Sequence, residues 1–304
     1  MDPLQKLTET HAILLDTARR SRGSNRADVL GFTLTELLVV IAALALMAVT
    51  ILPALARTRP DSQVFQCLSN HKRLMQAWSV YAADYADHVP NNFTIPETES
   101  AITTGRLDNW VNNIMTWDTA GIEGQSVTNN YWVTNGVFGR YTGSDVEIYR
   151  CPADSYLSPA QRSAGWTQRN RSISMNALFG LSDHTPNSAN GRSWYNSAYR
   201  QFLKTTDVPS PTGTWVLIEE HADSINEGFF IVDINATSWG DLPASYHNGA
   251  CTFSFADGHA EEHPWLSQTS KYSVKYSYLP RHFDALGKQD FQWYKARTGF
   301  TLLR

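Results

Sequence analysis

The chain has 304 residues, of which 42% are hydrophobic, enough for a sizeable core in one large domain or two small ones. The formal net charge is −4, only 18% of residues are charged, and no Lys/Arg cluster runs through the body, which argues against nucleic acid as the main partner. The three cysteines form no CxxC pair, which argues against a zinc ribbon or a redox motif.

The first pronounced feature is an uncharged run of 19 residues, Leu37–Leu55. As a helix it would span roughly 28 Å, close to the hydrocarbon core of a bilayer. Arginines concentrate ahead of it, which predicts a cytoplasmic N-terminus and a translocated body. Two other interpretations stay open: a buried helix of a soluble protein, and a secretory signal cleaved after the A-x-A sequence of residues 54–56.

The residues just before this run, GFTLTE at 31–36, resemble the processing site of type IV pilins and type II secretion pseudopilins. The resemblance implies that a prepilin peptidase cuts after Gly31 and methylates the new N-terminal residue, Phe32. In the family a glutamate stands at mature position 5 and a proline commonly at position 22, and Glu36 and Pro53 occupy these positions. It also implies a leader peptide over residues 1–31, for targeting only, and a transmembrane helix over 32–56.

Glu36 and Pro53 each call for a physical explanation. A carboxylate at the edge of an apolar helix costs up to about 3 kcal/mol in a membrane. The resemblance implies that Glu36 pairs with the N-terminal amine of a neighbouring subunit, and the alternative is an interfacial carboxylate without a partner. Pro53 removes a helical hydrogen bond, so we expect a kink near residues 49–53.

An amphipathic helix extension is predicted over residues 57–90, with a break or kink at Pro60 and an end at His88–Pro90. Its apolar and aromatic residues recur at helical spacing, and such a stripe is usually core rather than a ligand site. The stripe comprises Val64, Phe65, Leu68, Leu74, Met75, Trp78, Tyr81 and Tyr85.

Residues 91–304 are predicted to form a β-rich periplasmic or extracellular domain. Short runs rich in β-branched and aromatic residues alternate there with turn residues. The expected strands are Tyr131–Val133, Gly213–Glu219, Gly228–Ile234, Ala250–Phe255 and His259–Glu262. The predicted fold class is therefore α+β, with one long N-terminal helix packed on an antiparallel sheet that carries large loop insertions.

Pro152 and Asp154 predict a turn after Cys151. This segment resembles a recurring element of a pilin-like subgroup, as does the segment around Cys67. A disulfide between Cys67 and Cys151 would tie the helix to the body, and the alternative is a pair of buried thiols.

A second signature lies near the C-terminus, where His247 is followed by nine residues and then by Asp257-Gly258. This H-x9-DG pattern resembles the C-terminal motif of pilin-like proteins, and Asp257-Gly258 is predicted to be a hairpin turn. His247, Asp257 and His259 form a candidate cluster for calcium or another divalent metal, and the alternative is a hydrogen-bonded hairpin without an ion. Glu219, Glu220, His221 and Asp223 form a second candidate group.

No common catalytic motif occurs, so we expect no enzyme. Glu219 and Glu220 are adjacent on a strand and should point to opposite faces, which makes them a poor catalytic pair. The predicted function is a pilin-like structural subunit in or near a type II secretion or type IV pilus-like filament, with prepilin peptidase and other pilin-like subunits as partners. The predicted location is a single pass through the inner membrane. The alternative function is a membrane-tethered protein that binds carbohydrate or another ligand.

Overall fold

The computed structural model describes residues 33–182 and 190–301, except for the side chains of residues 48–61. Helix α2 (Leu34–Asp84) opens this part of the chain and continues through residue 60, so the break expected at Pro60 is not found. The chain divides into two units, Met1–Ala56 and Arg57–Arg304.

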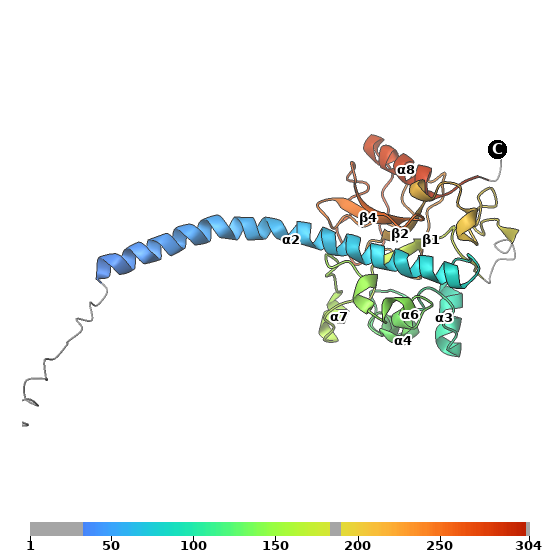
Figure 1. Cartoon of the computed structure of the whole chain (residues 1–304), viewed down its shortest axis with the longest axis horizontal. Helices are drawn as coiled ribbons and strands as arrows, with labels where there is room; N and C mark the ends of the chain where they lie inside the picture. Colours follow the sequence, from blue (N-terminus) through green and yellow to red (C-terminus); the bar gives the residue numbers. More distant parts are fainter. Residues whose placement is uncertain (1–32, 183–189, 302–304) are drawn as a thin grey trace, which may run out of the picture. The chain divides into compact units, whose positions relative to one another are not determined.

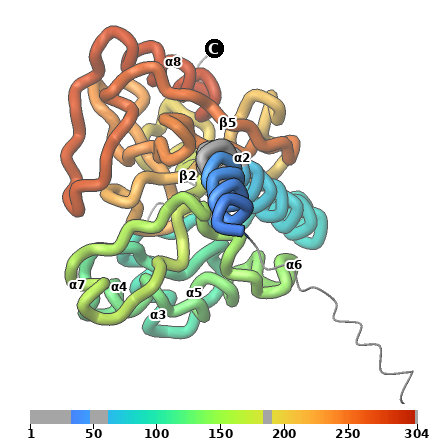
Figure 2. The backbone as a smooth tube through the Cα atoms, turned by 90° about the vertical axis from the view of Figure 1, so that its left-hand side faces the viewer, coloured from blue at the N-terminus to red at the C-terminus, as the bar shows by residue number. Residues whose placement is uncertain are grey.

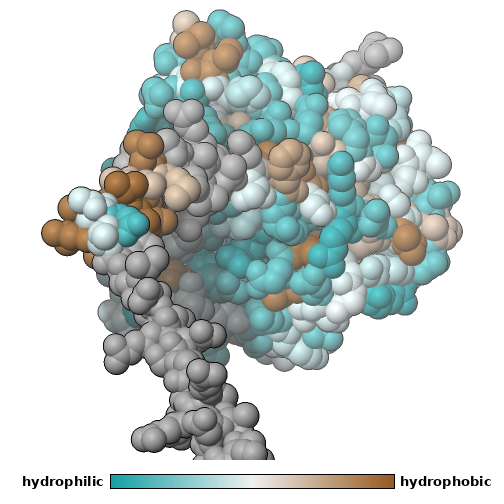
Figure 3. Space-filling view, turned by 60° about the vertical axis from the view of Figure 1, so that its left-hand side comes forward, coloured by the Kyte–Doolittle hydropathy of each residue, from teal (hydrophilic) through white to brown (hydrophobic). Residues whose placement is uncertain are grey.

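The first turns of α2 begin with a capping box. The Thr33 backbone N–H donates to Oε2 of Glu36 at 2.8 Å, and the Glu36 N–H returns a bond to Oγ1 of Thr33 at 3.3 Å. Large apolar side chains follow and are exposed between Leu34 and Met47. Figure 3 shows this stretch in brown between grey segments.

No helix in the described parts of the chain combines the length and the apolarity that crossing a bilayer requires. This finding contradicts the transmembrane helix expected over residues 32–56. It also contradicts the single-pass inner-membrane location with a periplasmic body, and it leaves the assignment as a type II secretion pseudopilin without structural support. Residues 1–32, including the predicted leader, lie outside the described residues, as do the side chains of 48–55 within the apolar run.

The body contains a five-stranded sheet with the order β3-β1-β2-β4-β5. Neighbouring strands are antiparallel except for β1 and β3, which are parallel. The expectation of an antiparallel sheet is therefore wrong, because β2 and β3 run in opposite directions on the two sides of β1. The strands are β1 (Ile173–Asn176), β2 (Trp215–Glu219), β3 (Phe229–Phe230), β4 (Ala250–Phe255) and β5 (Ala260–Pro264).

Short helices, rather than strands, fill the first part of the body. The strand expected at Tyr131–Val133 is wrong: these residues belong to helix α5, which buries Val133 and leaves Tyr131 51% exposed. In so short a segment β-propensity decides little, because it reflects packing against neighbouring strands. The short helices are α3 (Ile95–Thr104), α4 (Gly121–Ser126), α5 (Tyr131–Thr134), α6 (Gly139–Thr142), η1 (Val146–Tyr149), α7 (Pro159–Ser163), η3 (Thr205–Asp207) and η4 (Pro211–Gly213).

Within the unit Arg57–Arg304, α2 lies between the sheet and the short helices, and α8 (Ala285–Thr298) covers the other side of the sheet (Figures 1 and 2). One core cluster joins Leu74 and Trp78 of α2 to Met175 and Leu217 of the sheet. A second cluster joins the opposite face of the sheet to α8. Because both faces are covered, β2 and β4 are buried along their whole length.

Candidate metal centre

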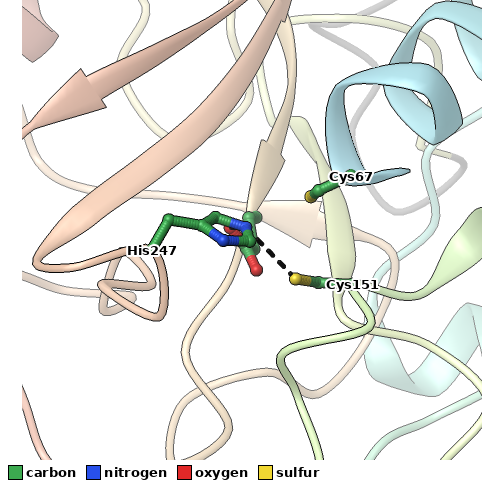
Figure 4. A group of neighbouring side chains, drawn as sticks. Cys67, Cys151 and His247 are labelled. Carbon is green, nitrogen blue, oxygen red and sulfur yellow. Dashed lines mark hydrogen bonds and ion pairs between the residues drawn. The ribbon is translucent and has the colours of Figure 1, made fainter. Parts of the chain in front are cut away.

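Four metal-ligating side chains from four separate segments meet inside the body. Their ligand atoms all lie within 4.8 Å of one another, and all four residues are buried. Figure 4 shows Cys67 on α2, Cys151 on the loop after η1 and His247 on the loop before β4. The fourth residue, Glu219, ends β2. We call these residues the four-ligand cluster.

The periodicity of α2 places Cys67 in the cluster. Asn70, His71 and Leu74 follow it at offsets of three, four and seven residues, and all four side chains are buried. Residues at these offsets share one face of a helix, and this face packs into the body. His71 borders the cluster: its Nδ1 lies 3.2 Å from Oγ of Ser254 on β4.

A tight turn presents the sulfur of Cys151. The Asp154 N–H donates to the Cys151 carbonyl at 3.0 Å, and the Ala153 N–H donates to Sγ of Cys151 at 3.3 Å. The Cys151 N–H donates to Oγ of Ser172 at 2.7 Å. Gln63 of α2 also donates to the carbonyl of Pro152 at 3.3 Å, which ties the turn to the helix. The expectation that Pro152 and Asp154 mark a turn is confirmed.

Strand alternation separates Glu219 from Glu220. Oε2 of Glu219 lies 3.3 Å from Nε2 of His247, whereas Glu220 accepts bonds from Ser174 at 2.6 Å and Ser224 at 2.8 Å. The prediction that the two glutamates point to opposite faces is confirmed, because successive side chains of a strand alternate.

His247 completes the cluster through a single ring nitrogen. Its Nε2 lies 3.3 Å from Sγ of Cys151 and 3.3 Å from Oε2 of Glu219. Burial lowers the pKa of His247. Its hydrogen bonds with Cys151 and Glu219 together outweigh burial and raise the pKa from 6.5 to about 10. Burial raises the pKa of Glu219. The hydrogen bond with His247 and the charge of its ring outweigh burial and hold the pKa of Glu219 below its ordinary value. The carboxylate and the imidazole therefore each favour the charged form of the other.

The two cysteines of the cluster are not joined to each other. All three cysteines of the chain are free in the structure, so the disulfide considered between Cys67 and Cys151 does not form there. Burial raises the pKa of both thiols, which favours their protonated form. The alternative of buried thiols describes this arrangement.

The candidate metal ligands of the hairpin, His247, Asp257 and His259, do not lie together. β4 lies between His247 and Asp257, and its six residues extend about 20 Å. The turn itself forms as predicted: Gly258 has φ +92°, and the Gly258 N–H donates to the Phe255 carbonyl. Asp257 pairs instead with His259, Oδ1 to Nδ1 at 2.6 Å, on the exposed tip.

The second predicted group of ligands is also divided. Glu219 joins the cluster, while Asp223 accepts a bond from Nε1 of Trp117 at 3.1 Å and Nε2 of His221 lies 3.2 Å from the Tyr272 carbonyl. Sequence reasoning assigned Cys67 and His247 to different sites. No local spacing joins the four ligands, and only the tertiary contacts bring them together.

The residues of the predicted processing and assembly site are described only in part. Gly31 and Phe32 lie outside the described residues, and so does the side chain of Pro53. Glu36 is described, and its carboxylate also accepts a bond from Oγ1 of Thr33 at 2.7 Å. This carboxylate therefore has an intramolecular role as a helix cap.

A pocket of about 660 Å³ lies between α8 and the segment around Tyr199 and Arg200. No tryptophan is among its lining residues. Trp78, Trp110 and Trp215 are buried in the core. The pocket therefore offers no tryptophan face on which a sugar ring could stack.

No family model matches the chain, and neither the curated proteins nor the solved structures include a significant match to it. Function must therefore be argued from the residues themselves. Two features bear on chemistry: the GFTLTE sequence at residues 31–36, and the four-ligand cluster in the body.

Proposed function

We propose that this chain is a pilin-like structural subunit, which prepilin peptidase cuts between Gly31 and Phe32 and which then assembles with other pilin-like subunits through α2. The sequence support is the match at four positions: Gly31, Phe32, Glu36 and Pro53. Gly31 suits a protease cleft because it has no side chain to hinder an extended backbone.

The observation that carries the proposal is the exposure of apolar side chains around the whole circumference of α2 near its start. Leu37–Ile41 are five consecutive apolar residues, and each is 44 to 68% exposed. At about 100° per residue, five consecutive residues sample every face of a helix. A helix that is hydrophobic all round is normally buried, so this segment needs a cover. The described residues of the chain do not provide this cover, and the same segments of neighbouring subunits would supply it.

Glu36 can serve this assembly in two ways that an experiment can separate. Its carboxylate caps α2 through Thr33, and its charge would attract the amine that cleavage creates at Phe32. Glu36→Gln keeps an oxygen that accepts the capping bonds but removes the charge. Thr33→Val removes the capping hydroxyl but keeps the charge.

The test begins with N-terminal sequencing of the mature protein from its native host. We expect a methylated Phe32 as the first residue. Gly31→Val should leave the chain uncut, because a branched side chain replaces the hydrogen of glycine in the protease cleft. A mature protein that starts at Met1 or at Arg57 would refute the proposal.

Assembly is then compared between Glu36→Gln and Thr33→Val, both of which should still be cut. We expect the Gln variant to be missing from sheared filaments that contain the wild type, and the Val variant to be present. If both variants assemble like the wild type, the charge of Glu36 has no role in assembly and that part of the proposal fails.

A further inference from the structure

We propose that Cys67, Cys151, Glu219 and His247 bind one zinc ion, which acts as a structural clamp between α2 and the sheet. This site is independent of the filament function proposed above. It also differs from the hairpin cluster expected from the H-x9-DG pattern, because His247 is the one residue of that pattern that takes part.

The spacing of the ligand atoms fits tetrahedral zinc. Zinc lies about 2.3 Å from sulfur and about 2.0 to 2.2 Å from nitrogen or oxygen, so two ligand atoms on one tetrahedral ion are about 3.3 to 3.8 Å apart. Nε2 of His247 lies 3.3 Å from Sγ of Cys151 and 3.3 Å from Oε2 of Glu219, which fits this range. All remaining pairs lie within 4.8 Å, so small side-chain movements would close the site.

The chemistry of the ligands selects the ion. Two cysteine sulfurs and an imidazole are soft or borderline ligands, and zinc binds them together with a carboxylate oxygen. Calcium and magnesium prefer sites made of oxygen alone, so the calcium considered from the sequence does not fit here. Because four protein ligands fill a tetrahedron and all four residues are buried, the site leaves no position open for a substrate.

Unpartnered polar atoms also point to an ion. Among the described residues, the second carboxylate oxygen of Glu219 and Nε2 of the neighbouring His71 are buried without a hydrogen-bond partner. Oε2 of Glu219 is paired with His247, whereas Oε1 is buried without a partner, and a bound ion would supply one. A dication would neutralise two of the three negative charges that Glu219 and two thiolates carry together.

The position of the cluster explains what the ion would do. Cys67 lies on α2, and the other ligands come from three segments of the body that are far from it in sequence. One ion bound to all four would hold the helix against the sheet, as a disulfide between Cys67 and Cys151 would otherwise do. Binding free energy at such a site contributes directly to folding.

The first test measures the metal content of the full chain, purified without chelator, by elemental analysis. We expect one zinc per chain. Cys67→Ala, Cys151→Ala and His247→Ala should each weaken zinc binding by more than about tenfold. The matched control is Cys251→Ala, because Cys251 is also buried and free but its sulfur donates to the backbone carbonyl of Glu219 at 3.2 Å. Zinc retained in the ligand variants, or lost equally in the control, would overturn the proposal.

The second test needs no variant, so it also decides the matter if the ligand variants fail to fold. Cobalt exchanged into the wild-type protein should show the visible bands of a tetrahedral site and the near-ultraviolet band of thiolate coordination. A chelator strong enough to remove the ion should lower the Tm of the wild type. The proposal is wrong if the wild type contains no metal and thiol titration under denaturing conditions finds Cys67 and Cys151 in a disulfide. It is equally wrong if bound cobalt lacks the thiolate band.

Discussion

Arg169 donates from Nη2 to Oδ2 of Asp154 at 2.8 Å, and the two side chains are only 2% and 1% exposed. Asp154 ends the turn that presents Cys151, so this ion pair stabilises the loop that supplies one of the four ligands. The planar guanidinium of Arg169 also lies over the ring of Trp117, 4.5 Å from its centroid. The pair is thus enclosed on several sides.

Asp154→Asn should lower the free energy of unfolding by about 3 kcal/mol, because it leaves the buried guanidinium of Arg169 without a counter-charge. Urea denaturation of the full chain measures this change. The control is Arg73→Gln, which breaks a pair with Asp145 whose side chains are 43% and 35% exposed. It should cost less than about 1 kcal/mol. Equal costs for the two variants would contradict this prediction.

Asn70→Ala should destabilise the protein by about 2 kcal/mol. The Asn70 side-chain amide donates to the carbonyls of Glu147 and Arg150, at 3.1 and 2.9 Å, and so fastens α2 to the segment that leads into Cys151. Gln66→Ala is the matched control, because Gln66 is exposed and loses only its bond to Asn70. Denaturant titration should show little change for Gln66→Ala. A result in which the control costs as much as Asn70→Ala would refute the anchoring role.

Gly180→Ala should cost roughly 3 kcal/mol. Gly180 has φ +83°, and an added Cβ would lie 2.2 Å from the carbonyl oxygen of Pro90, so the substitution combines backbone strain with a clash. Gly105→Ala offers the comparison, since Gly105 has φ +72° with nothing within 4 Å of an added Cβ. It should cost only about 1 kcal/mol. Thermal unfolding of both variants checks the difference, and similar Tm values would count against the clash.

His263→Phe should reduce the loss of stability in acid. The ring of His263 stacks on Trp293 at a centroid distance of 3.5 Å, and burial lowers its pKa from 6.5 to about 4. Between these two pKa values the unfolded chain binds more protons than the folded chain, so this group lowers stability as the pH falls from 6.5 toward 4. Phe keeps the stacking and does not titrate.

The free energy of unfolding, measured at about pH 7 and about pH 5, should therefore differ less in His263→Phe than in the wild type. Partial exposure screens the charge, so we expect the difference to shrink by on the order of 1 kcal/mol. An unchanged difference would show that His263 does not contribute to the acid sensitivity.

Parts of the fold with strong local patterns were predictable. The strand at Ala250–Phe255 and the turn at Asp257-Gly258 follow from β-branched and aromatic residues beside a turn dipeptide. In contrast, Phe65 belongs to the apolar stripe predicted on the helix but is 73% exposed. Periodicity predicts which residues share a face, whereas contacts with the rest of the chain decide how much of that face is buried.

The sequence by itself determined two features that depend on neighbours along the chain: the opposite directions of Glu219 and Glu220, and the hairpin turn at Asp257-Gly258. Tertiary structure alone decided that the sheet is mixed and that His247 joins Cys67, Cys151 and Glu219 rather than Asp257. The physical reason is that strand direction and pairing are set by long-range contacts. Those contacts separate His247 from Asp257 by the length of β4 while bringing it next to residues far away in the chain.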